Sequence, residues 1–136
     1  HDLGRIITAG FAEPNSGEPG AIAGFTSERV LRSPAEGHFK TGKTIGDPVT
    51  AGEIIGSVAG HSVSSRIDGV IRGLIRPQTK VTKGLKIGDV DPRGQRRYCH
   101  TISEKARAIA GSVLEAILRK YNIDGLDKPA PEGGQE

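Results

Sequence analysis

The sequence predicts a mainly β fold built from two repeated halves and followed by one C-terminal α-helix. An internal repeat at an offset of 32 residues predicts the halves, because eight of the 26 pairs between segments 33–58 and 65–90 are identical. Short apolar stretches separated by Gly and Pro are typical of strands and turns. A later apolar stripe with spacings of three and four residues indicates the helix.

Each half is predicted to contain three short strands, and the two halves together would form one small, flattened barrel. The expected strands are 29–33, 37–43 and 53–58 in the first half, and 63–67, 70–75 and 86–90 in the second. Asp47-Pro48 and Arg76-Pro77 are placed in turns, because proline lacks an amide donor. The expected core side chains are Val49, Ile55, Val58, Val81, Ile87 and Val90.

The regions outside the repeat complete the predicted organisation. Residues 1–28 form an N-terminal arm with a short strand at Arg5 to Thr8, and 29–91 form the repeated module, with halves at about 29–59 and 63–91. Residues 92–124 form a connector and an amphipathic helix, for which Thr101 and Glu104 form a capping box. The helix needs a partner surface for its apolar stripe. Residues 125–136 are expected to be disordered.

The repeated module resembles biotinyl and lipoyl domains, whose fold is a barrel-sandwich hybrid, also called a hammerhead. The resemblance rests on the turns Pro34–Gly37 and Ile67–Gly69 and on the run Gly46–Gly52. In those domains a lysine at the tip of the hairpin between the halves carries the prosthetic group. Here the junction is Val58–Val63, and no lysine occurs between Lys43 and Lys80. We therefore expect neither biotin nor lipoate to be attached.

Four groups of residues could carry chemistry. Asp89 and Asp91 would share one face of a strand, where they could hold a hard cation or accept backbone amides at a turn, with Arg93 as ion partner. Cys99 and His100 precede the helix, whose dipole could activate the thiol, although a structural role is favoured. His61 and His38 are expected to be solvated. No motif for a catalytic nucleophile, a nucleotide loop or a metalloprotease occurs, so we expect no enzyme activity in this chain.

Composition excludes several classes of protein. The formal net charge of +3 is a weak field, and three Phe, two Tyr and no Trp offer little for stacking on bases, which argues against nucleic-acid binding. No apolar run suits a membrane span or a signal peptide, and the single Cys fits a reducing compartment, so a cytoplasmic protein is expected. The absence of Met and the start at His1 predict a fragment of a longer protein whose activity, if any, lies upstream.

Across most of its length the chain also resembles a bacterial family of accessory proteins of selenium-dependent molybdenum hydroxylases, related to maturation factors of xanthine and CO dehydrogenases. The matching segments are His1–Arg5, Glu13–Gly17, Arg29–Pro34, Lys83–Gly94, Thr101–Ala106 and Val113–Ile117. The run Lys83–Gly94 is the most specific. The chain is similar to the carboxy-terminal portion of such proteins.

The resemblance implies an assembly module connected with the molybdenum cofactor pathway, and it carries over no catalytic residue. Its partners would be a molybdenum hydroxylase, other maturation proteins or the missing amino-terminal portion, with a homo-oligomer as a further possibility. The alternatives are a small-ligand or metal site between Asp89 and His100, or an interaction-only hammerhead. The candidate ligand-binding residues are Lys86, Asp89, Asp91, Arg93, Gly94, Cys99 and His100.

Overall fold

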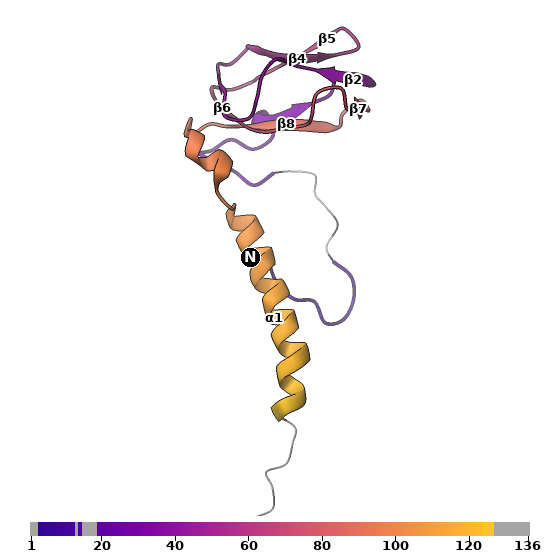
Figure 1. Cartoon of the computed structure of the whole chain (residues 1–136), viewed down its shortest axis with the longest axis vertical. Helices are drawn as coiled ribbons and strands as arrows, with labels where there is room; N and C mark the ends of the chain where they lie inside the picture. Colours follow the sequence, from indigo (N-terminus) through magenta and orange to yellow (C-terminus); the bar gives the residue numbers. More distant parts are fainter. Residues whose placement is uncertain (1–2, 13, 15–18, 127–136) are drawn as a thin grey trace, which may run out of the picture. The chain divides into compact units, whose positions relative to one another are not determined.

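The computed structural model describes residues 3–12, 14 and 19–126 (Figure 1). They belong to two compact units. The β unit comprises residues 15–101, and the helical unit combines residues 1–14 with residues 102–136. The expected disordered tail lies outside the described residues from position 127 onwards.

The described strands of the β unit form two four-stranded antiparallel sheets. One sheet has the order β1-β8-β6-β3 and the other has the order β5-β4-β2-β7. The strands are β1 (Val30–Arg32), β2 (Gly37–Lys40), β3 (Pro48–Val49), β4 (Ile54–Val58), β5 (His61–Ser64), β6 (Gly69–Leu74), β7 (Lys80–Val81) and β8 (Lys86–Asp91). The prediction of a mainly β fold is confirmed.

The hydrogen bonds repeat at the offset found in the sequence. Ser33 Oγ donates to Ala35 O at 2.6 Å, and its equivalent Ser65 Oγ donates to Ile67 O, also at 2.6 Å. A shift of 32 residues converts β1 to β4 into β5 to β8, and therefore converts one sheet into the other. Further equivalent pairs are Ser33 N to Leu85 O with Ser65 N to Glu53 O, and Gly46 N to Ile71 O with Gln78 N to Phe39 O.

The core lies between the sheets and draws equally on the two halves. All six core residues expected from the sequence are buried. Two larger side chains at equivalent positions, Phe39 and Ile71, are completely buried with them. The hydrophobic cluster also contains Leu31, Val63 and Ile67. In β2 and β5 the buried residue is flanked by polar ones, while β1 and β6 each carry two consecutive buried apolar residues. The apolar faces of the two sheets pack together, as in other two-sheet folds.

The strand prediction was incomplete in three places. Each half has four strands instead of three, because Pro48–Val49 and Lys80–Val81 pair as short edge strands. Pro48 was expected in a turn, but an edge strand tolerates a residue without an amide donor. Residues 5–8 form no strand.

Helix α1 (Glu104–Leu126) begins after a cap different from the predicted one. Ser103 Oγ accepts a hydrogen bond from Ala106 N at 3.2 Å, so Ser103 is the N-cap. The expected cap, Thr101, instead donates its hydroxyl hydrogen bond to Tyr98 O at 3.3 Å. The capping box was therefore placed two residues too early. None of the helices that the structure describes is long and apolar enough to cross a membrane.

The N-terminal segment around Gly4 covers only part of the surface of α1. Gly4 lies against the helix where Ser112 Oγ donates to Gly4 O, and a Cβ on Gly4 would come within 2.9 Å of Ala108 O. This contact uses small residues and leaves the predicted apolar stripe open. The exposed apolar side chains on α1 are Ile109, Val113, Leu114, Ile117, Leu118 and Tyr121.

The close approach of β4 to β2 makes Gly56 a sensitive position. A Cβ there would collide with Lys40 O and lie 2.7 Å from the Phe39 ring. We expect Gly56→Ala to lower the free energy of unfolding by about 1–3 kcal/mol, because neither the backbone nor a buried ring can move freely. Urea denaturation measures the change. Gly42→Ala is the matched control, since a Cβ at Gly42 meets nothing within 4 Å. Equal stability of the two variants would contradict this account of the packing.

Candidate functional site

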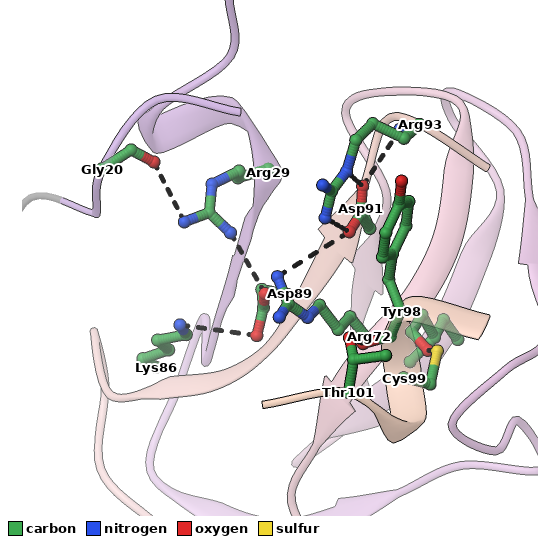
Figure 2. A network of polar contacts seen from close by, with 11 residues as sticks. Gly20, Arg29, Arg72, Lys86, Asp89, Asp91, Arg93, Tyr98, Cys99 and Thr101 are labelled. Carbon is green, nitrogen blue, oxygen red and sulfur yellow. Dashed lines mark hydrogen bonds and ion pairs between the residues drawn. The ribbon is translucent and has the colours of Figure 1, made fainter. Parts of the chain in front are cut away.

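Two carboxylates emerge from the last strand of the β unit on the same face (Figure 2). Asp89 and Asp91 are two residues apart in β8, so strand alternation directs both side chains to one side. Asp91 is 1% exposed, although it is charged. The structure brings four cationic side chains to this pair: Arg29, Arg72, Lys86 and Arg93.

Arg93 holds Asp91 in a bidentate arrangement. The distances are 2.9 Å from Arg93 Nε to Asp91 Oδ1 and 2.6 Å from Arg93 Nη2 to Asp91 Oδ2. The backbone N–H of Arg93 also donates to Oδ1 at 3.1 Å, and Gly94 N donates to Asp91 O at 3.2 Å. Gly94 has a φ of 65°, which glycine adopts without strain. The run Asp91–Gly94 is thus a turn closed by its own ion pair.

The hydrogen bonds from the Arg93 side chain are the main reason that the pKa of Asp91 lies below its ordinary value. Burial opposes this effect by disfavouring the charged carboxylate, and the backbone N–H and charge of Arg93 reinforce it. The charge of Arg72 acts in the same direction. Asp91 is therefore ionised at neutral pH despite its burial.

Asp89 is held by a residue that sequence reasoning missed. Arg29 Nη1 donates to Asp89 Oδ2 at 3.1 Å, and Arg29 Nη2 donates to Gly20 O, also at 3.1 Å. The Arg29 side chain is 9% exposed, and its Nε has no hydrogen-bond partner among the described residues. Lys86 Nζ lies 3.5 Å from Asp89 Oδ1. No local pattern indicates this pair, because Arg29 and Asp89 are 60 residues apart in the chain.

Arg72 is the second residue that was missed, and a β-bulge positions it. Ile71 pairs with Val90 and Gly73 pairs with Asp89, so the register between β6 and β8 skips Arg72. Such a bulge redirects a side chain. Arg72 Nη1 lies 3.8 Å from Asp91 Oδ2, and Figure 2 shows its guanidinium between the two carboxylates. No feature of the linear sequence marks the skipped position.

The short 3₁₀ helix η2 (Arg96–His100) lies against β6 and contains the predicted Cys99–His100 pair. Cys99 Sγ donates to Ile71 O at 3.5 Å, which gives the thiol a structural contact. The ring of Tyr98 lies under Arg93, with 3.7 Å from the guanidinium carbon to the ring centroid. His100 is exposed. Cys99 does not stand at the start of the long helix, because α1 begins at Glu104.

The predicted carboxylates and the predicted Cys–His pair do not form one ligand set. Within the described ranges, no group of three or more His, Cys, Asp or Glu side chains is arranged to hold a metal ion. The two carboxylates are engaged by guanidinium and ammonium groups instead. The geometry therefore suits ion pairing and anion recognition better than metal coordination.

The ion-paired residues Arg29, Arg72, Lys86, Asp89, Asp91 and Arg93 are called the charged face. The repeat gives this face a structural counterpart. The β1·β8 pair has the same register as the β4·β5 hairpin shifted by 32 residues, since Val30 pairs with Asp89 as Ser62 pairs with Ser57. Residues 40–43 and 54–57 line an open hollow, and their counterparts 72–75 and 86–89 include Arg72, Lys86 and Asp89 of the charged face. In the hollow, Lys40 stands where Arg72 stands on the charged face, while Ser57 replaces Asp89.

Comparison with known proteins gives one close sequence relative. No family model matches the chain. It is 42% identical over 118 residues to an uncharacterised protein of Escherichia coli K12, YqeB, covering 87% of this chain and 22% of that protein. The chain thus spans about a fifth of the length of the curated relative it matches. An aspartoacylase family protein of Mesorhizobium loti matches with a TM-score of 0.41 and 19% identity, over 47% of this chain and 23% of that one.

The lowered pKa of Asp91 predicts a pH-dependent stability. The ordinary Asp pKa is about 3.9. Since the folded-state pKa is lower, the contribution of Asp91 is complete well above that value and is lost as pH falls through the folded-state pKa. We expect Asp91→Asn to lower the free energy of unfolding by about 3 kcal/mol at pH 7, because it removes the buried carboxylate that Arg93 and Arg72 bind. The difference from the wild type should shrink as pH falls below the ordinary Asp pKa towards the lowered pKa of the folded state.

Urea denaturation at pH 7 and at acid pH measures both effects. Glu36→Gln is the control, because the ion pair of Glu36 with Lys80 is exposed on both sides and should change stability by less than about 1 kcal/mol. A deficit of Asp91→Asn that stays constant with pH would argue against ionised Asp91 as its source.

Proposed function

We propose that this chain is an accessory module in the maturation of a molybdenum hydroxylase, and that it acts by binding and not by carrying a covalently attached cofactor. Its β unit is, in this proposal, a barrel-sandwich hybrid of the biotinyl and lipoyl type. Support for the fold comes from the exchange of strands between halves, since each sheet contains two strands of each half. The resemblance of the run Lys83–Gly94 to the accessory family supports the biological setting.

The observation that carries binding over carriage is the hairpin between the halves. Strands β4 and β5 are joined by Ala59 and Gly60 alone, with Val58 paired to His61. Both loop residues have positive φ, 48° and 82°, as in the tightest two-residue hairpins. This tip has no lysine. Covalent carriage requires an amine at that position.

A binding role also needs a surface for a partner, and α1 supplies one. Its exposed apolar residues recur at spacings of three and four, so they form a stripe such as helices use for packing. Ile117 and Leu114 are 48% and 57% exposed. The occupant we propose is the remainder of a longer protein, because the relative that matches 87% of this chain is more than four times its matched length. Intramolecular docking would then bury the apolar stripe of α1 against the rest of that protein.

The absence of carriage can be measured directly. We expect the intact mass of the chain, purified from its native host, to equal the mass calculated from its sequence, because the hairpin tip has no acceptor amine. A mass increased by a biotinyl or lipoyl group would contradict the proposal. A known biotinylated protein from the same cells is the positive control.

The partner can be tested by affinity purification of the tagged chain from its native host. We expect a molybdenum hydroxylase or its maturation proteins to co-purify. We expect Ile117→Glu to reduce binding of the separately expressed remainder of the longer protein at least about tenfold, because it buries a charge in an apolar contact. Arg107→Gln is the matched control, since Arg107 is an exposed polar residue of the same helix. Recovery of no protein of this system would refute the assignment to molybdenum hydroxylase maturation.

A further inference from the structure

We infer that the charged face of the β6·β8 pair binds a phosphate group or a similar doubly charged oxyanion. This inference rests on the proposed binding function and adds the class of ligand. The face combines Arg72, Lys86 and Arg93 around two carboxylates (Figure 2). Its counterpart on β2·β4 is an open hollow with Lys40 in place of Arg72. Comparison of the two equivalent places therefore shows which features come from the repeated fold and which occur on the charged face alone.

The charges on this face do not balance. Four cationic groups surround two carboxylates, which leaves an excess of two positive charges. Arg93 satisfies both oxygens of Asp91, and Arg29 donates to one oxygen of Asp89. The carboxylates are therefore already paired without Arg72 and Lys86. These two side chains supply the excess charge.

Arg72 has hydrogen-bonding capacity that its neighbours do not use. Its side chain is 20% exposed, and among the described residues its guanidinium has only the 3.8 Å ion pair with Asp91 and no hydrogen bond. A guanidinium offers five N–H donors in a planar fork. Solvent reaches these donors, because Arg29 Nε, and no atom of Arg72, is found buried without a hydrogen-bond partner among the described residues. An anion in front of the fork would satisfy them, and the bulge at Arg72 fixes the fork at this place.

Two further cations flank Arg72, so the site favours an anion with two negative charges. Lys86 is 47% exposed and lies 3.5 Å from Asp89, which is a loose ion pair, while Arg93 is 35% exposed. Lys86 can direct its ammonium group towards a ligand at Arg72, while Arg93 adds positive charge from its place on Asp91. Arginine forks match the geometry of phosphate oxygens, and a partly desolvated setting strengthens the attraction. A cation would need free carboxylate oxygens, whereas the Asp91 oxygens are both held by Arg93.

The test is a titration of the ¹⁵N-labelled full chain with inorganic phosphate at pH 7.5, with total ionic strength held constant by sodium chloride. We expect saturable changes in the amide resonances of residues 72–74 and 86–89, and none in the counterparts 40–42 and 54–57. Replacement of phosphate by chloride should produce no such changes. Changes of equal size with chloride, or equal changes on both faces, would overturn the inference. Glycerol phosphate, added in a separate titration, distinguishes an organic phosphate monoester from the free ion by which of the two binds more tightly.

Matched variants assign the effect to the proposed residues. We expect Arg72→Gln to weaken phosphate binding at least about tenfold, the loss that corresponds to one charge-assisted hydrogen bond. Lys40→Gln, the equivalent change on the hollow, should leave the affinity unchanged. Lys86→Gln alters a side chain that is 47% exposed, and should weaken binding about threefold, the loss of one exposed charge pair. Unchanged affinity in both Arg72→Gln and Lys86→Gln would overturn the inference, and a fold defect in Arg72→Gln leaves the Lys86→Gln result decisive.

The outcome is separable from that of the proposed function. Phosphate binding is measured on the purified chain and needs no partner protein. Co-purification with the molybdenum hydroxylase system, combined with no phosphate binding, would reject only the anion site. Phosphate binding without such partners would reject only the assignment to maturation.

Discussion

The β unit depends on the pairing of its first strand with its last. Strand β1 lies beside β8 with Val30 opposite Asp89, and no loop joins them at that end. Its counterpart, β4 with β5, is closed covalently by Ala59–Gly60. At the open end, the β1·β8 ladder and one side-chain ion pair join the halves, because Arg29 binds Asp89. Arg72 and Arg93 bind Asp91 within the second half and at its exit.

Burial strengthens the ion pairs of Asp91, and it also makes the stability of this carboxylate depend on its partners. A carboxylate as inaccessible as Asp91 is stable only while its partners remain in place, because an unpaired charge in that position is very unfavourable. Tyr98 packs under Arg93 and helps to hold its guanidinium in place. Cys99 donates to Ile71 O and so contacts strand β6. The residues after β8 therefore contribute to the β unit, although the sequence assigned them to a connector.

The sequence predicted the fold where local patterns and the repeat agreed. Ile55 with Ile87 and Val58 with Val90 were recognised as core pairs, because identity at a constant offset and strand alternation gave the same answer. Asp89 and Asp91 were recognised as a surface of interest by the same alternation. Two features escaped. Arg29 meets Asp89 across 60 residues of chain, and the skipped position of Arg72 depends on strand register, which composition and spacing do not encode.

The adjacency of Arg29 and Asp89 has a topological consequence. The chain enters and leaves the β unit through neighbouring strands, so the whole unit is a closed excursion that begins and ends at one place. Domains of this kind can be inserted into a host loop or circularly permuted with little strain, since their ends already meet. In a circular permutant, the chain could be joined across the gap between β1 and β8 and opened at the Ala59–Gly60 turn. Evolution can therefore move this unit between proteins without rebuilding its core.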